Sequence, residues 1–341
     1  MKHTNLQNNS LKYIDLFCGI GGFRVAMENV CRSFGVEAEC LLSSDIDAEC
    51  QKAYAANFGE TPKGDITKIE ARETPDHDIL LAGFPCQPFS IIGHMKGFED
   101  TRGTLFFEIA KILQKKKPAA FVLENVKLLV GHNGGKTIAH IMETLKKLKY
   151  YADYRVFNAI DFGLPQKRER VFIVGFKDHF HFNWPEGKIP MTPLSKILEK
   201  KAPQKHYASD YIKKKRWSQL EPTKEPTIWH ENKAGHVSAY PYSCALRAGA
   251  SYNYLLVNGE RRLTPREMLR LQGFPDSYKI VCNDSQIRKQ AGNSLPIPVA
   301  QAVIKNVIEA CGLNLYAAQE TTMYSAVDGQ LQSFEESAPY E

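Results

Sequence analysis

Short apolar segments alternate with segments of helical pattern through the first half of the chain. The apolar segments, which we read as strands, are residues 12–17, 38–44, 78–82, 119–123, 154–158 and 171–176. The helical segments between them are residues 23–34, 48–57, 104–115 and 138–148. Strands that alternate with helices predict a doubly wound α/β sheet. Ligands bind such sheets at the carboxyl ends of the strands, where polar and glycine-rich turns follow most of these segments.

This pattern breaks near Trp184-Pro185 and resumes at Thr264-Pro265, a favourable helix start. Residues 196–233 hold ten Lys/Arg and five Asp/Glu, with scattered prolines. The densest basic run is Lys213 to Arg216, which Trp217 follows. It fits either a solvated helix face or a phosphate-contacting surface with an aromatic neighbour. A last helix is expected over 298–311, and the polar, acidic residues 317–341 are expected to be a flexible appendage.

Composition limits the class of protein. In 341 residues, 44 are Lys or Arg and 38 are Asp or Glu, a formal net charge of +6 that permits a polyanionic partner without requiring one. Hydrophobic residues make up 43%, which excludes wholesale disorder. No apolar run approaches the roughly 18 residues of a membrane span, and Met1 to Lys12 lacks an apolar signal core. We therefore expect a soluble, intracellular protein.

The cysteines and histidines do not predict a metal site. None of the eight cysteines forms a C-x-x-C pair, and the ten histidines do not cluster with them. His179 and His181 form an isolated pair that we interpret as a solvated strand end. The cysteine content is too low for a disulfide scaffold, which fits a reducing compartment.

A glycine-rich turn follows the first predicted strand. Gly19 and Gly21 match the spacing of the dinucleotide motif G-x-G-x-x-G, but its third position is Arg24. Asp45 ends the next strand, where it could accept hydrogen bonds from ribose hydroxyls. Alone, Asp45 could equally cap a helix. Together the two features favour an adenosine-bearing cofactor.

Three further segments carry reactive side chains. Cys86 lies between Pro85 and Pro88 after a buried strand, so a stiff backbone holds a candidate nucleophile there, although a free cysteine can also be a small buried hydrophobe. Glu124 ends the next strand and is expected to face the same cleft. Strand alternation places Arg168 and Arg170 on one side, where they could hold a phosphate near a thiolate. Each arginine alone could also have a structural role.

Together, these segments form an ordered set of motifs. They read D-L-F-C-G-I-G-G-F (15–23), G-D-I (64–66), G-F-P-C-Q-P-F-S (83–90), G-F-E-D-T-R-G-T-L-F (97–106), E-N-V (124–126), Q-K-R-E-R (166–170), R-L-T-P-R-E (262–267) and G-N-S (292–294). In this order the chain resembles the DNA (cytosine-5) methyltransferases, those of bacterial restriction-modification systems in particular. The resemblance covers about residues 12 to 311.

The resemblance implies a Rossmann-like class I methyltransferase domain with a smaller, irregular target-recognition domain. The first part of the catalytic, S-adenosylmethionine-binding domain is expected over 11–183 and the target-recognition domain over 184–262. Residues 263–312 would form the hinge and return to the catalytic domain, and 313–341 the flexible tail. The basic region then falls where DNA would be recognised.

The resemblance also implies a mechanism and its residues. Cys86 would add to carbon 6 of cytosine, so that carbon 5 can take a methyl group from S-adenosylmethionine without a metal. Glu124 would contact ring nitrogen 3 and the amine, with its pKa raised by burial. Arg168 would hold the base near its carbonyl, supported by Arg170. The implied cofactor residues are Phe17, Gly19, Ile20, Gly22, Asp45, Ile46, Asp65, Ile66, Pro85, Leu105, Asn293 and Ser294.

Double-stranded DNA is the implied partner, because a cytosine must be flipped out of the duplex to reach Cys86. Residues 90–102 resemble the mobile loop that closes on the flipped base. The residues expected to contact DNA are Gln87, Ser90, Ile92, Lys213, Lys214, Lys215, Arg216 and Arg247. The resemblance further implies a monomer in the bacterial cytoplasm that acts on the nucleoid. A cognate restriction endonuclease that acts on the same site is a possible partner.

Two positions depart from the family pattern. Ile46 replaces an aromatic residue that some relatives place against adenine, and Cys244-Ala245-Leu246 stands where many have threonine before an aliphatic residue. Two alternative functions stay open: a transfer RNA cytosine-5 methyltransferase and a catalytically inactive DNA-binding regulator. A nicotinamide oxidoreductase is disfavoured by Arg24.

Overall fold

The computed structural model describes residues 10–85, 105–179 and 181–312 of the chain. Its strands are β1 (Ser10–Leu16), β2 (Glu37–Ser44), β3 (Ile79–Gly83), β4 (Ala120–Val126), β5 (Tyr151–Asn158), β6 (Gln166–Lys167), β7 (Glu169–Phe176), β8 (Ile228–Glu231), β9 (Val237–Tyr240), β10 (Ser243–Cys244) and β11 (Leu255–Val257). Its α-helices are α1 (Gly22–Ser33), α2 (Ala48–Phe58), α3 (Leu105–Lys116), α4 (Leu128–Gly131), α5 (Lys136–Lys147), α6 (Leu194–Ile197), α7 (Asp210–Trp217), α8 (Pro265–Arg270), α9 (Asp284–Asn293) and α10 (Ile297–Ala310).

A six-stranded sheet organises the larger part of the chain, in the order β2-β1-β3-β4-β7-β5. The pairs among β2, β1, β3 and β4 are parallel, and β7 runs antiparallel to both β4 and β5. The strand order reverses between β1 and β3, so the turns after β1 and β3 diverge at this point. That is the place where open α/β sheets bind ligands.

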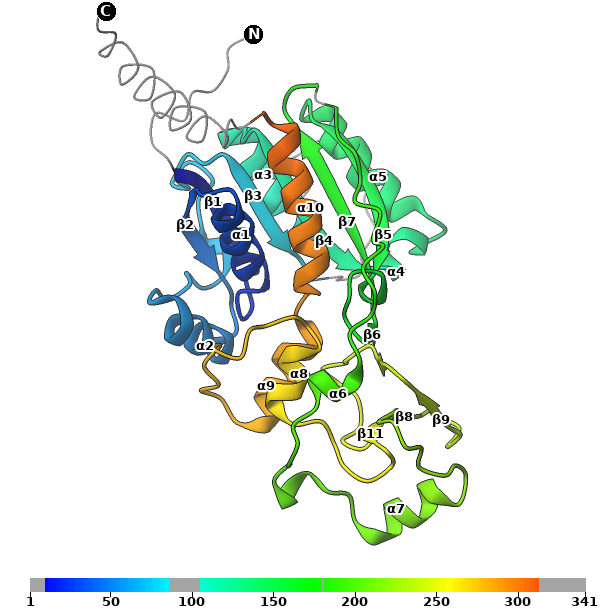
Figure 1. Cartoon of the computed structure of the whole chain (residues 1–341). Helices are drawn as coiled ribbons and strands as arrows, with labels where there is room; N and C mark the ends of the chain where they lie inside the picture. The colour runs from blue at the N-terminus through cyan, green and yellow to red at the C-terminus, as the bar shows by residue number, and fades with distance from the viewer. Residues whose placement is uncertain (1–9, 86–104, 180, 313–341) are drawn as a thin grey trace, which may run out of the picture.

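Helices cover both faces of this sheet (Figure 1). Helices α1 and α10 pack on one face, against Tyr13, Leu81 and Val122, while α3 and α5 pack on the other, against Ile14 and Leu80. Alternate residues of β1 therefore serve opposite cores, as period-two strands require. Helix α10 comes from the far end of the chain, so this part of the molecule is discontinuous in sequence.

A smaller part of the chain, which contains α7 and β8 to β11 and which we call the small part, lies below the carboxyl ends of β1 to β4 (Figure 1). Its core is the antiparallel sheet β11-β8-β9, with Trp229 fully buried. The two-stranded pairing of β10 with β6 joins this part to the end of β7. Helices α8 and α9 stand between the two parts, as the colours from yellow to orange show in Figure 1.

The structure confirms the predicted α/β fold. Each predicted strand and helix of the first 176 residues is present, with ends that differ by up to three residues from the prediction. The features that were not predicted include the antiparallel direction of β7, the strands β6 and β8 to β11, and the helices α4, α6 and α9. Within the described residues, no helix is long and apolar enough to cross a membrane.

Candidate active site

A cavity of about 720 Å³ opens at the carboxyl ends of β1 to β4. All twelve residues expected to bind the cofactor line it, although they come from segments as far apart as β1 and the turn after α9. These are Phe17, Gly19, Ile20, Gly22, Asp45, Ile46, Asp65, Ile66, Pro85, Leu105, Asn293 and Ser294. Glu124 and Arg170 line the same cavity, so one space adjoins both the cofactor residues and the expected catalytic carboxyl.

The glycine turn gives this cavity its floor. Phe17, Gly19 and Gly21 have positive φ angles of 55°, 54° and 83°, so the chain reverses sharply between β1 and α1. A Cβ at Gly21 would lie 2.3 Å from the Phe58 ring. A Cβ at Gly22 would lie 3.1 Å from Ser294 Oγ. The turn therefore excludes side chains where α2 and the segment after α9 approach it.

Asp45 is fixed by backbone donors at the end of β2. One of its carboxyl oxygens accepts the Gly19 N–H at 2.8 Å, and the other accepts the Asp47 N–H at 2.8 Å. Each carboxylate oxygen can accept a second hydrogen bond, so Asp45 keeps acceptor capacity for hydroxyl groups. Burial raises its pKa, against the lowering effect of the two N–H donors. The neighbouring Ile46 is 75% exposed beside the cavity.

Asp65 marks another side of the cavity. Its carboxylate accepts hydrogen bonds from the backbone N–H of Thr67 at 3.0 Å and from the Thr67 hydroxyl at 2.8 Å. These two donors lower the pKa of Asp65. The side chain is therefore an oriented, ionised acceptor, suited to an amino group on a ligand.

The buried Glu124 and the partly buried Arg170 form an ion pair in the lining of the cavity. Arg170 Nε lies 2.8 Å from Glu124 Oε1, across the antiparallel pairing of β4 with β7. Burial raises the pKa of Glu124, while the charges of Arg170 and Arg168 oppose this shift. Burial thus favours the protonated carboxyl, as the sequence led us to expect for a group that contacts a ring nitrogen.

Asn125 connects this pair to the segment that leads to Cys86. Its side-chain amide donates to the Phe84 carbonyl at 2.9 Å, and its side-chain oxygen accepts the Val126 N–H at 2.8 Å. Asn125 is buried, so it holds the backbone two residues before Cys86 against the end of β4. Cys86, Gln87, Ser90, Ile92 and the loop 90–102 lie outside the described residues, as does the tail 313–341.

Arg168 lies in a different place from the one expected. It is fully buried and donates to the carbonyls of Leu246, Gly292 and Ser294 rather than lining the cavity. The arginine that pairs with Glu124 is Arg170. Arg168 lies between β6 and β7 rather than within a strand, so strand alternation does not set its direction, and the carbonyls of residues 246, 292 and 294 use its donors.

Helix α9 supplies cavity residues that sequence reasoning missed. Lys289 Nζ lies 2.6 Å from Asp47, which caps α2, and Gln290 donates to the Glu49 carbonyl at 3.0 Å. Both residues line the cavity. The signal available was the Asn283 cap, whose side chain accepts the Gln286 N–H, ahead of the G-N-S motif. These contacts tie the end of the chain to α2.

A polar cluster lies beneath the glycine turn. Arg24 binds Glu28 at 2.7 Å, the Tyr54 hydroxyl at 3.2 Å and Glu60. Asp15, on β1, is fully buried, and within the described residues neither of its carboxyl oxygens has a hydrogen-bond partner. Burial raises the pKa of Asp15 to about 8, partly offset by the charge of Arg24. Arg24, which stands at the third position of the dinucleotide motif, therefore makes contacts within the protein, beneath the turn.

Three of the four basic residues of α7 form ion pairs within the protein, so they are not all free to bind DNA. Lys213 pairs with Asp210 at 3.1 Å, and Lys215 pairs with Glu231 at 2.9 Å. Lys214 is exposed. Arg216 is 1% exposed and binds Glu231 at 2.7 Å, so its expected contact with DNA is replaced by an internal one. Elsewhere, Arg247 is exposed and lies over the Tyr254 ring, 4.9 Å from its centroid.

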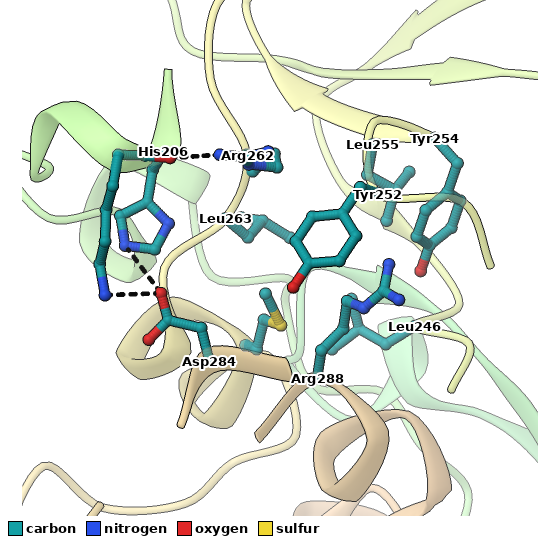
Figure 2. Close-up of a pocket in the computed structure, with 11 residues that line it drawn as sticks. His206, Leu246, Tyr252, Tyr254, Leu255, Arg262, Leu263, Asp284 and Arg288 are labelled. Carbon is teal, nitrogen blue, oxygen red and sulfur yellow. Dashed lines mark hydrogen bonds and ion pairs between the residues drawn. The ribbon is translucent and has the colours of Figure 1, made fainter. Parts of the chain in front are cut away.

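A second cavity, of about 240 Å³, lies between the small part and α9 (Figure 2). Asp284 on α9 pairs with Lys205 at 2.7 Å, and Arg288, one turn later, lies over the Tyr252 ring. It shares no lining residue with the first cavity, because α9 separates the two. Within the described ranges, no group of three or more His, Cys, Asp or Glu side chains is placed to hold a metal ion.

Comparison with known proteins gives a consistent result. Residues 11–309 match the family described as C-5 cytosine-specific DNA methylase. The chain is 55% identical to Type II methyltransferase M.NgoBI of Neisseria gonorrhoeae over 299 residues, covering 86% of this chain and 92% of that one. It is 51% identical to Type II methyltransferase M.HaeII of Haemophilus aegyptius over 322 residues, 93% and 99% of the two chains. The fold is similar to the crystal structure of the S. pombe Dnmt2 methyltransferase, with a TM-score of 0.68 at 18% identity over 89% and 99% of the chains.

Proposed function

The chain belongs to the C-5 cytosine-specific DNA methylase family, and from that premise we propose how its residues divide the work of methyl transfer. It is a DNA (cytosine-5) methyltransferase, which methylates carbon 5 of cytosine at specific DNA sites. The observation that carries the proposal is the single cavity that brings the cofactor residues and the Glu124–Arg170 pair together at the carboxyl ends of β1 to β4.

The cavity fits S-adenosylmethionine as the cofactor. Its volume of about 720 Å³ is within the range of small-molecule sites. Asp45, fixed by two N–H donors, would accept the ribose hydroxyls, and Asp65 would accept the adenine amine. Phe17 would stack on the adenine ring. The cofactor supplies an activated methyl group on a sulfonium, and this chemistry uses no metal.

The protein's own residues would prepare the cytosine. The Cys86 thiolate forms a bond to carbon 6, and the electron pair of the carbon 5–carbon 6 bond moves through the ring towards nitrogen 3. Glu124, whose pKa burial raises, shares a proton with nitrogen 3 as that negative charge develops. Arg170 holds Glu124 in place and faces the base. Once carbon 5 carries the methyl group, a base removes its proton, and the carbon 6–sulfur bond breaks to restore the thiolate.

Double-stranded DNA would bind across the cavity mouth with the target cytosine flipped out. The segment 86–104 follows Pro85 directly, so its expected DNA-contacting residues Gln87, Ser90 and Ile92 belong to the chain next to the site. Arg247 and Lys214 are the exposed basic residues of the small part that we assign to DNA. Lys213 and Lys215 can exchange their acidic partners for phosphates.

The biological setting is also part of the proposal. The similar proteins from Neisseria gonorrhoeae and Haemophilus aegyptius are named type II methyltransferases. We place this chain in a bacterial restriction-modification system, where it would act in the cytoplasm as a monomer on the same site as a cognate endonuclease. Single-base chemistry needs one cavity, and this chain contains all the residues assigned to it.

A methyl-transfer assay tests the proposal. Labelled S-adenosylmethionine is incubated with plasmid DNA and either the wild type or Cys86→Ser, followed by bisulfite sequencing. We expect methylated cytosines within one short sequence for the wild type and none for the variant. The bisulfite map also identifies the recognised sequence.

The same assay separates the alternatives. Transfer to RNA oligonucleotides but not to DNA would favour a transfer RNA methyltransferase. DNA binding without transfer to either substrate would favour an inactive regulator. A Cys86→Ser protein that methylates DNA as fast as the wild type would overturn the role of Cys86.

A further inference from the structure

Arg168 lies where three segments that are distant in the sequence meet. Its fully buried guanidinium donates from Nη1 to the Leu246 carbonyl at 3.0 Å. From Nη2 it donates to the Gly292 carbonyl at 3.0 Å and to the Ser294 carbonyl. Leu246 belongs to the small part, while Gly292 and Ser294 line the cofactor cavity. One side chain therefore bonds both a small-part segment and a wall of the cavity.

These two segments also touch each other directly. A Cβ at Gly292 would lie 2.5 Å from the Ala248 nitrogen and 2.9 Å from the Arg247 carbonyl carbon. Gln166, two residues before Arg168, accepts the Leu246 N–H at 3.0 Å and donates to the Leu271 carbonyl at 2.7 Å. Residues 246–248 thus lie against the C-terminal end of α9 and are also bound by Gln166 and Arg168.

The arrangement makes relative movement of the segments costly. A guanidinium is planar, so its donors point in fixed directions and each carbonyl has one favourable position. Burial strips water from Arg168, and hydrogen bonds to carbonyls replace that water at Nη1 and Nη2, while Nε has no partner among the described residues. If either segment shifts, a buried charge loses a partner that nothing else supplies. The small-part segment and the cavity wall therefore move as a unit.

We propose that Arg168 is a positioning residue that couples DNA held by the small part to cofactor held in the cavity. This inference rests on the proposed function. Arg247, the residue after Leu246, is exposed for DNA, and Asn293 lies between the two cavity-side carbonyls that Arg168 binds. DNA that orders residues 246–248 thereby orders the cavity wall. By linkage, the cofactor strengthens DNA binding by the same factor.

The test measures the dissociation constant of S-adenosylhomocysteine, the demethylated product, with and without a duplex that carries the sequence found by bisulfite mapping. For the wild type we expect the duplex to tighten binding at least about fivefold. Arg168→Lys keeps the charge but loses the planar guanidinium, and we expect its ratio of dissociation constants without and with the duplex to fall to about one.

The matched control is Arg261→Lys. Arg261 is a buried arginine whose side chain binds Glu267 at 2.8 Å, away from the cavity wall. It should keep the wild-type ratio.

Three results would overturn the inference: a wild-type ratio of one, a wild-type ratio retained by Arg168→Lys, or the same loss of coupling in Arg261→Lys. If Arg168→Lys does not fold, Gly292→Ala replaces it, because its methyl group must push residues 247–248 away from the turn. A wild-type ratio in folded Gly292→Ala would also contradict the coupling. The methyl-transfer assay keeps the two proposals distinguishable. If the wild type methylates DNA but the duplex does not change its affinity for S-adenosylhomocysteine, only the coupling is contradicted. If the wild type transfers no methyl group to DNA, the proposed function itself is contradicted.

Discussion

Asp15 is a buried carboxyl whose protonation should make stability depend on pH. Its folded-state pKa is about 8, raised by burial, against an ordinary value of 3.8. Between these values the folded state keeps the proton and the unfolded state has released it, so rising pH favours unfolding. The stability that depends on this proton is fully lost only above about pH 8.

Asp15→Asn should remove that dependence. Between pH 6 and pH 9, the free energy of unfolding of the wild type should fall relative to the variant by about 3 kcal/mol. Urea unfolding at both pH values measures the difference. Parallel changes in the two proteins would show that Asp15 ionises normally in the folded state.

Glu124→Gln keeps the size of the side chain but removes its acidic proton, so it tests the chemical role of Glu124. Glutamine cannot supply a proton to ring nitrogen 3, so we expect single-turnover methyl transfer to slow by roughly 10²- to 10⁴-fold. Glu169→Gln is the control, because Glu169 lies on β7 and pairs with Lys127 at 2.7 Å, outside the cavity. Equal rates for wild type and Glu124→Gln would exclude the proposed role.

The residues of the site differ in how far the sequence predicted them. The family resemblance implied the twelve cofactor residues together, and the structure places all of them around one cavity, while their contacts with the cofactor stay a prediction. The different places of Arg168 and Arg170 were not predicted. They depend on the carbonyls of residues 246, 292 and 294, which only the folded chain brings near Arg168. The burial of Arg216 likewise follows from Glu231 and the Asn253 carbonyl, which are distant in sequence.

At the scale of elements, the start of α8 offers a clean test of helix capping. Pro265 stands at the first position of the helix start that the sequence predicted, and the structure adds a capping box formed by Thr264 and Glu267. Thr264→Ala should lower the free energy of unfolding by at least about 1 kcal/mol, because the hydroxyl that accepts the Glu267 N–H at 3.2 Å is lost together with its bond to Glu199. Ser209→Ala is the control, since Ser209 precedes α7 without a side-chain capping bond. Equal losses in denaturant unfolding would contradict the assignment.

The element pattern of the large sheet was predictable because each strand and helix carries its own periodicity. The direction of β7 was not, since antiparallel pairing with β4 and β5 is a long-range choice that no local pattern encodes. The small strands β8 to β11 are two to four residues long, too short to show alternation. Helix α9 is largely polar on its surface, so its apolar signal is weak beside its clear N-terminal cap.

At the scale of the whole molecule, DNA affinity should depend on salt through few exposed cations. Lys214→Ala should reduce the slope of log affinity against log salt by about 0.9, because one phosphate contact is lost. Lys305→Ala is the control on α10, where Lys305 faces Glu309. Titrations of labelled duplex at several salt concentrations measure the slopes. A change for Lys305→Ala alone would place the DNA on another face.

Helix α10 packs against α1, and Ser294 lies against Gly22, although these partners are far apart in the chain. A ribosome making about 5–20 residues per second adds the 294 − 22 = 272 intervening residues in roughly 14 to 54 seconds. During that interval the nascent chain has its glycine turn but not the wall that faces it. An enzyme that marks DNA is therefore inactive until Ser294 has been synthesised, and a chain terminated before that residue leaves the genome unmarked.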